Sequence, residues 1–257
     1  MKKLIITTII LLSISYVFSQ ESERNNASFS LGDGISFSFN EGDYEFNIYG
    51  FIKPTYIYND EKIYTADGEY SNVFRQFKSQ NSNLFFTGFA KDEKLSFTIQ
   101  MDYSSSNPLV EAFIGYHFNE KTTLYFGQMQ VNHNNLEMTH NEDRLRFTNR
   151  GILSQTYTEN GEEFGLFFET SFGKSIIFKP TLAITSGDGK NSFGDDSRDS
   201  DKGGVKFGSR INIFPFGDFS IGNRLSTVDL MHEERPKVQI GFCLLYTSDA
   251  ADDSQCV

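Results

Sequence analysis

Residues 162–185 constrain the fold more than any other stretch, because their side chains alternate between apolar and polar in steps of two. The arms EEFGLFFETS (162–171) and SIIFKPTLAIT (175–185) meet at Gly173-Lys174. Successive side chains of a strand point to opposite faces, so the stretch predicts a β-hairpin with one apolar face. Each arm has the roughly 9–11 residues with which a tilted strand crosses a bilayer. Six residues are expected on the outer, convex face: Phe164, Leu166, Phe168, Ile176, Phe178 and Leu182.

The two ends of the chain are expected to lie outside the folded native part. Met1-Lys2-Lys3, a short apolar run and Ser19 predict a secretory signal peptide over residues 1–19. The string CLLYTSDAAD at 243–252 resembles a translated sequencing adapter, so residues 243–257 are interpreted as a non-native tail. Cys243 and Cys256 both lie in this tail, and the native part is therefore expected to need no disulfide.

Between these ends, residues 20–43 are expected to form an N-terminal segment with a short strand at 35–39, and residues 44–242 about ten amphipathic strands. They include one long strand through Tyr44 and Tyr58 and two last strands at 219–227 and 237–242. Short turns are expected at 91–94, 119–121, 173–174 and 215–218. Longer connections are expected at 59–82, 104–108, 131–161, 187–203 and 228–236. This rhythm is typical of an up-and-down transmembrane barrel, although a soluble sandwich has the same two-residue period.

The composition excludes one large class of partner. The chain has 23 basic and 34 acidic residues, a net charge of −11, which argues against nucleic acid. It also has 27 Phe and 12 Tyr, residues that favour strands and form the aromatic belts of outer-membrane barrels.

An ordered set of short stretches resembles the phosphate-selective porin O and P family over about residues 34–242. The set contains LYFGQ at 124–128, a loop with three arginines, EFGL at 163–166, GSRIN at 208–212 before Pro215, and Asp229-Leu230 before Glu234, Pro236-Lys237 and Gly241. The resemblance implies an all-β, antiparallel up-and-down transmembrane β-barrel of about sixteen strands in the bacterial outer membrane. It also implies a homotrimer and a third outer loop folded into the pore. With about ten strands before the tail, the barrel is expected to be incomplete.

The expected function is an outer-membrane porin whose water-filled pore passes small solutes, including anions such as phosphate, with no enzymatic activity and no cofactor. Loop 131–161 is the expected constriction, where Arg144, Arg146 and Arg150 contact anions through their forked donors. These arginines could instead pair with nearby acids and hold the loop; the acids are Glu137, Glu142 and Asp143.

The side chains opposite the apolar parity are expected to face the lumen. The basic ones are Lys53, Lys179, Lys206 and Arg210, and the others are Glu111, His117, Glu163 and Glu169. A pore that selects phosphate is expected to have a more basic lining than this acidic chain offers, so the sequence does not identify the preferred solute.

Two other classes are kept as alternatives: a non-pore outer-membrane barrel and a soluble extracellular β-sandwich that binds a ligand. The chain has no HExxH, GxSxG or phosphate-loop motif to support an enzyme. An acidic loop could chelate calcium, but its spacing is not that of an EF-hand and a solvated outer loop is favoured. Its acids are Asp195, Asp196, Asp199 and Asp201.

Overall fold

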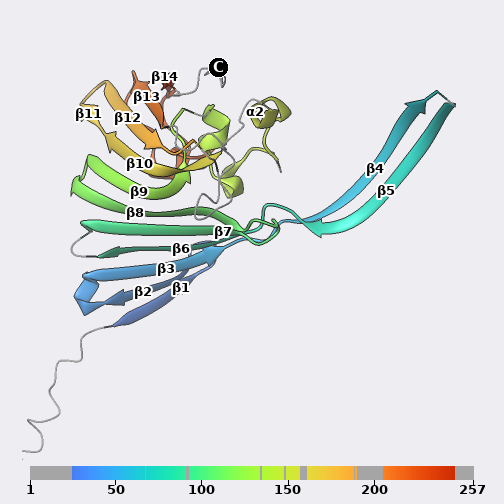
Figure 1. Cartoon of the computed structure of the whole chain (residues 1–257). Helices are drawn as coiled ribbons and strands as arrows, with labels where there is room; N and C mark the ends of the chain where they lie inside the picture. The colour runs from blue at the N-terminus through green and yellow to red at the C-terminus, as the bar shows by residue number, and fades with distance from the viewer. Residues whose placement is uncertain are drawn as a thin grey trace, which may run out of the picture.

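The structure is a computed structural model. It describes residues 25–66, 68–90, 93–133, 135–147, 149–156, 161–187, 189 and 205–246. The described chain is all-β, with a 12-stranded antiparallel sheet and a separate two-stranded sheet (Figure 1). The signal peptide, the four aspartates of the acidic loop and residues 247–257 lie outside the described residues.

The main sheet contains β1 (Asn26–Ser30), β2 (Gly34–Phe39), β3 (Tyr44–Gly50), β6 (Asn83–Ala90), β7 (Leu95–Asp102), β8 (Leu109–Asn119), β9 (Thr122–Gln130), β10 (Glu162–Thr170), β11 (Phe172–Gly173), β12 (Ile177–Thr185), β13 (Lys206–Phe214) and β14 (Ile240–Tyr246). The two-stranded sheet contains β4 (Pro54–Thr65) and β5 (Gly68–Ser79). The helical segments are η1 (Asn40–Gly42), η2 (Leu136–Thr139), η3 (Glu142–Arg144), α2 (Ile152–Thr156) and η4 (Ile221–Asn223).

Strands of the main sheet follow one another up and down in chain order, except that β4 and β5 leave the sheet and β11 pairs only with β12. The connections after β3, β7, β9 and β12 therefore share one end of the sheet. That end carries the β4–β5 hairpin and the 131–161 loop, while the turns at 40–43, 93–94, 120–121 and 174–176 lie at the other (Figure 1). The expected long-and-short rhythm is confirmed for these connections. It is wrong for the connection from β13 to β14, which was expected as a short turn at 215–218 and instead runs over residues 215–239.

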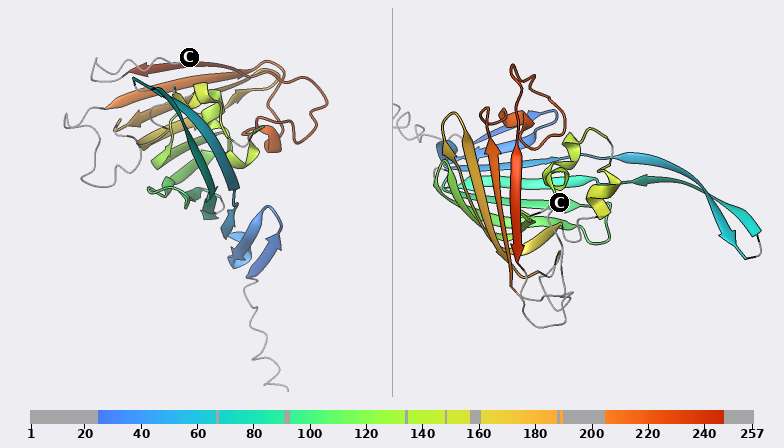
Figure 2. Two further views of the ribbon diagram at one scale, coloured as in Figure 1. Left: turned by 90° about the vertical axis from the view of Figure 1, so that its right-hand side faces the viewer. Right: turned by 90° about the horizontal axis from the view of Figure 1, so that it is seen from above.

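The main sheet is curved (Figure 2). We call its outer face the convex face, and the strand register places a row of apolar side chains and one glycine on it from β2 to β14. A single cross-strand row contains Phe37, Phe46, Gly88, Phe97, Ile114, Phe126, Leu166, Ile184, Phe207 and Tyr246. Gly88 matters here because a Cβ at this position would lie 2.5 Å from the Phe97 ring, whose centroid is 6.0 Å from that of Phe46. Leu166 and Leu182 are 42% and 54% exposed.

The opposite, concave face is polar and partly covered. Glu163 is 0% and Lys206 6% exposed, and Phe167 and Ala183 are also buried. The expected sidedness of the hairpin is confirmed for five of the six residues, because the strand register places them on the face opposite these groups: Phe164, Leu166, Phe168, Phe178 and Leu182. The sixth, Ile176, lies in the turn before β12, where strand register does not set its side.

The long strand expected from Tyr44 to Tyr58 and the polar connection at 59–82 are wrong. β3 ends at Gly50, where Phe51 and Asn83 exchange backbone hydrogen bonds of 2.9 and 3.1 Å. The chain then enters a hairpin of two 12-residue strands. Its polar side chains are satisfied across the strands, as in the 2.7 Å Lys62–Glu69 ion pair, which is why a polar sequence can form strands here.

Three further expectations near the ends are corrected. Residues 26–30 of the expected flexible start pair with β2 as β1. Residues 219–227 form η4 and irregular backbone, not a strand. The last strand begins at Ile240, not Lys237, and continues through residues 243–246 of the interpreted tail, so the final edge is displaced along the chain.

The main sheet is open within the described residues. β1 pairs there only with β2 and β14 only with β13. Residues 243–246 pair with β13 although they were interpreted as non-native. An unpaired strand edge offers its backbone groups to any extended segment, and the alternating apolar side chains Phe242, Leu244 and Tyr246 favour an extended segment here.

Candidate functional site

Two segments lie against the concave face, and they define the candidate site. The first is the 131–156 loop with η2, η3 and α2, and the second is residues 215–239 with η4 (Figure 2). The Asn132 side-chain amide donates to the Gly208 carbonyl of β13 at 3.3 Å. The backbone amide of Thr227 donates to the Arg144 carbonyl at 3.1 Å, which joins the two segments.

A buried ion pair lies on the concave face of the sheet, next to the start of the 131–156 loop. Lys206 Nζ is 2.9 Å from Glu163 Oε1, and the hydroxyl of Thr185 donates to the other carboxylate oxygen. The three residues come from β13, β10 and β12. Partners on both carboxylate oxygens offset the cost of removing two charges from water.

Gly208 allows the loop to approach this wall. A Cβ here would lie 2.6 Å from Asn132 Oδ1 and 2.8 Å from His133 Nδ1, closer than side-chain atoms normally come. Burial lowers the pKa of His133, opposed by the Glu163 carboxylate and assisted by the Lys206 ammonium. At its start, the loop thus places the side chains of Asn132 and His133 against the backbone of Gly208, next to the buried ion pair.

Arg150 holds the loop from inside. Its Nε is 2.8 Å from Glu142 Oε1, and its two terminal nitrogens donate to the carbonyls of Glu137 and, at 2.7 Å, His140. The side chain is only 11% exposed. For Arg150, the arrangement matches the alternative from the sequence, in which the guanidinium pairs with a loop acid.

Glu137 makes a second internal tie. Its carboxylate accepts hydrogen bonds from the Ser154 hydroxyl and, at 3.0 Å, from the Gly151 amide. These bonds, in that order, lower the pKa of Glu137 against a small opposing effect of burial. The carboxylate therefore links η2 to the start of α2 in its charged form.

Arg144 and Arg146 differ from Arg150. Arg144 is half-exposed, donates to the Gly222 carbonyl at 3.1 Å and lies 3.9 Å from Asp143 Oδ2. Arg146 is exposed, with its guanidinium carbon 5.9 Å from the Phe147 ring centroid. Within the described chain no ion pair holds Arg146, so its donors remain accessible.

The other predicted lumen-facing cations are placed as follows. Lys179 Nζ lies 2.6 Å from Asp218 Oδ2, and Arg210 Nε donates to Asn212 Oδ1 at 2.8 Å. Lys53 lies in the short segment between β3 and β4, where its backbone amide donates to the Ser82 hydroxyl at 2.9 Å. Lys179, Lys206 and Arg210 share the concave face by register, whereas Lys53 lies at the rim.

The polar side chains predicted on this wall also have partners there. The two His117 ring nitrogens are each 2.9 Å from a hydroxyl, those of Ser96 and Thr123. The Glu111 carboxylate accepts a hydrogen bond from the backbone amide of Gln130 at 3.0 Å. These polar side chains therefore bond to one another across neighbouring strands, among aromatic rings such as Phe89 and Tyr125, whose centroids lie 6.2 and 6.3 Å from that of His117.

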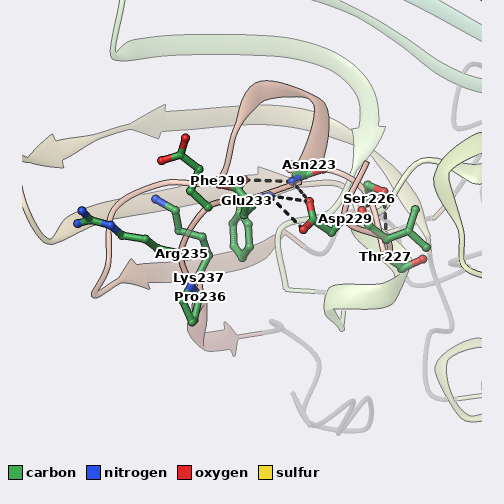
Figure 3. Close-up of a pocket in the computed structure, with 11 residues that line it drawn as sticks. Phe219, Asn223, Ser226, Thr227, Asp229, Glu233, Arg235, Pro236 and Lys237 are labelled. Carbon is green, nitrogen blue, oxygen red and sulfur yellow. Dashed lines mark hydrogen bonds between the residues drawn. The ribbon is translucent and has the colours of Figure 1, made fainter. Parts of the chain in front are cut away.

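The 215–239 segment contains a feature that the sequence reasoning missed. The Asn223 side chain donates to Asp229 at 2.7 Å and Glu233 at 3.1 Å, and its oxygen accepts the amides of Leu230 and Met231 (Figure 3). An open groove of about 480 Å³ runs beside it toward Arg235 and Lys237. The sequence signal was the density of Asn, Asp and Gly in 217–229, which favours turns over a strand.

Asp218 was also missed. It lies between two cations, 2.6 Å from Lys179 Nζ and 2.9 Å from Arg224 Nη2. Asp218 links the start of the 215–239 segment to β12. No local sequence motif predicts this contact, because its partners are far apart in the chain.

No family model and no curated protein matches the chain. No helix among the described residues is long and apolar enough to cross a membrane. The same residues contain no cluster of three or more His, Cys, Asp or Glu suited to a metal ion.

Proposed function

We propose that this chain is the major part of a bacterial outer-membrane porin of the phosphate-selective porin O and P type. In the proposal, the up-and-down sheet is the wall of a transmembrane β-barrel of about sixteen strands, and in the intact protein the strands that close it follow residue 242. The pore is filled with water and passes small solutes by diffusion, without chemistry on them.

The observation that carries the proposal is the inverted polarity of the sheet. A soluble protein buries its apolar side chains, but here Leu166 and Leu182 are exposed while Glu163 and Lys206 are buried. An apolar surface extending over so many strands far exceeds the few hundred Å² usual on soluble monomers. Lipid tails on the convex face and water on the concave face satisfy both surfaces, which a soluble sandwich does not.

The two segments on the concave face form the proposed constriction. Arg146 and Arg144 are the proposed anion contacts, because their guanidinium groups are at least partly exposed. Arg150 is proposed to hold the loop in shape, because its donors are already taken by Glu142 and two carbonyls. The acidic surroundings favour a general pore for small ions over strict phosphate selection.

The membrane part of the proposal is tested on the chain as it stands. We expect it to need detergent to stay dispersed and to insert into phospholipid vesicles, leaving protease-protected strands. Dispersal as a monomer in plain buffer would refute the membrane assignment.

The pore part is tested with the protein from the intact gene in planar bilayers. We expect discrete conductance steps, and a reversal potential that moves toward cation preference in Arg146→Ala. Arg150→Ala is expected to increase current noise with little change in that potential. A reversal potential unchanged in Arg144→Ala/Arg146→Ala would remove these residues from the constriction.

A further inference from the structure

The groove beside Asn223 lies next to the place where the two segments on the concave face meet. Its volume is about 480 Å³, which is within the range of small-molecule sites. Two of its lining residues, Ser226 and Thr227, donate their hydroxyls to the Arg144 carbonyl, each at 3.3 Å. A solute in the groove is therefore next to the proposed constriction.

Side chains of both charges line the groove, and all of them come from the 215–239 segment. The bases Arg235 and Lys237 lie on the side away from Asn223 and Asp229 (Figure 3). Within the described chain, no ion pair involves a charged side chain of the groove. These side chains are Asp229, Glu233, Glu234, Arg235 and Lys237.

Neutral hydrogen-bond donors hold two of the acids in place. Asp229 accepts from the Asn223 side chain at 2.7 Å, and Glu233 accepts from the Ser220 backbone amide at 2.7 Å. These bonds are the main reason why the pKa of each carboxyl is lowered, and burial opposes them only weakly. Both acids therefore keep their charge in neutral and mildly acidic water, although no cation neutralises them by direct contact.

The bases of the groove contrast with a charge at the start of the same segment. Asp218 is taken up by two cations, at 2.6 Å from Lys179 Nζ and 2.9 Å from Arg224 Nη2. Lys237 Nζ donates only to a backbone carbonyl, that of Phe216 at 3.1 Å, and Arg235 is exposed. The segment thus pairs its first acid within the fold and leaves the charges of the groove available to a ligand.

We propose that the groove binds zwitterionic solutes, namely amino acids and short peptides. The carboxylates hold the ammonium group of such a solute, and the Arg235 guanidinium holds its carboxylate, because the forked donors match the two oxygens. Phe219, Val228 and Pro236 add apolar surface for a side chain. This deepens the proposed function by naming a solute class, and its transport part rests on that function.

Solutes with a single kind of charge fit the groove less well. A free anion such as phosphate meets three carboxylates there, and a simple cation meets a guanidinium and an ammonium group. A divalent metal is disfavoured, because the residues that the structure describes contain no cluster of three or more His, Cys, Asp or Glu suited to one. An open groove binds weakly, which suits a transport route because the solute must also leave.

The test measures binding to the full chain in detergent micelles by ligand-observed NMR titration. The probes are dialanine, which has both charges, N-acetyl-dialanine, which has only the carboxylate, and dialanine amide, which has only the ammonium group. We expect dialanine to bind at least about tenfold more tightly than either capped form, because each cap removes one charge-assisted contact. Equal affinities for the three probes, or displacement of dialanine by inorganic phosphate, would overturn the proposal.

Two variants locate the binding without disturbing the turn around Asn223. Glu234 and Arg235 have no hydrogen bond or ion pair within the described chain. Arg235→Gln is expected to remove the advantage of dialanine over dialanine amide, and Glu234→Gln to reduce its advantage over N-acetyl-dialanine. Lys121→Gln, on the turn between β8 and β9, is the matched control and should leave all three affinities unchanged. An unchanged dialanine affinity in both groove variants would place the binding elsewhere and overturn the proposal.

Conductance of the protein from the intact gene separates this inference from the pore itself. Selective dialanine binding in micelles without conductance steps overturns the pore and leaves the groove as a binding site. Conductance steps without selective dialanine binding overturn the groove alone.

Discussion

The convex and concave faces of the sheet are built from the same strands, yet they follow opposite rules. On the convex face, residues such as Leu166 and Leu182 are exposed. On the concave face, Glu163 and Lys206 are buried together and covered by a loop fixed through Asn132. The same two-residue period produces both faces. The two segments that lie against the concave face show that the protein itself packs on that face and leaves the convex face exposed.

This difference indicates where the stability of the molecule resides. The concave face depends on specific hydrogen bonds and on ion pairs such as Lys206–Glu163 and Lys179–Asp218, so it should be sensitive to the removal of a single partner. The convex face depends on its surroundings, so it should be sensitive to a charge and tolerant of apolar exchange. The predictions below test this contrast.

The largest effect is expected from breaking the buried pair. Glu163→Ala leaves Lys206 charged and without its partner, and it should cost about 3–5 kcal/mol in unfolding free energy. Glu163→Leu/Lys206→Met, which removes both charges, should recover most of the loss. Urea unfolding of the chain in detergent micelles measures both variants, and a double variant as unstable as Glu163→Ala would show that the pair is not what holds this wall.

A charge on the convex face should have the next largest effect. Leu166→Arg should destabilise the lipid-inserted protein by about 2–4 kcal/mol, because lipid tails cannot solvate a guanidinium. Thr98→Arg, on the concave side of β7, is the control and should cost less than half as much. Unfolding in vesicles compares the two, and equal costs would mean that both faces meet the same solvent.

How far the sequence could predict the fold depends on how local the signal is. The alternation in 162–185, although interrupted at Thr170, predicted both the hairpin and its sidedness, because strand geometry alone decides which side chains share a face. Most of the β4–β5 hairpin was mistaken for a polar connection at 59–82, because cross-strand partners such as Lys62 and Glu69 are seven residues apart and neither is apolar. Residues 219–227 were mistaken for a strand because their apolar residues were given more weight than Asn223. The side chain of Asn223 bonds to Asp229 and to the backbone amides of Leu230 and Met231, which holds a turn.

The candidate site was less predictable, for a related physical reason. The loop itself could be recognised by its length and arginines, and the pairing of Arg150 with Glu142 was one of two readings that the spacing allowed. The contacts that place the loop on the wall join residues far apart in the chain, such as Asn132 with Gly208. Only the strand order brings these residues together.

The smallest effect concerns the bonds inside the loop that covers the concave face. The hydrogen bond from Ser154 is the main reason why the pKa of Glu137 is lowered, so Ser154→Ala should raise that pKa toward its ordinary value. A carboxyl with a lowered folded-state pKa stabilises the fold above its unfolded pKa, and the effect is lost as the pH falls through the lowered value. The native loop should therefore loosen only in acid below the usual glutamate range, and at a higher pH in Ser154→Ala.

Carboxyl-carbon NMR titration of Glu137 measures this shift directly. Thr156→Ala is the matched control, because its hydroxyl donates to the Ile152 carbonyl on the same short helix at 2.8 Å and does not reach Glu137. If both alanine variants move the Glu137 titration equally, α2 acts on the carboxylate through its general stability. If only Ser154→Ala moves it, the loop covering the concave face is held by individual bonds, in contrast to the convex face, where no single partner matters.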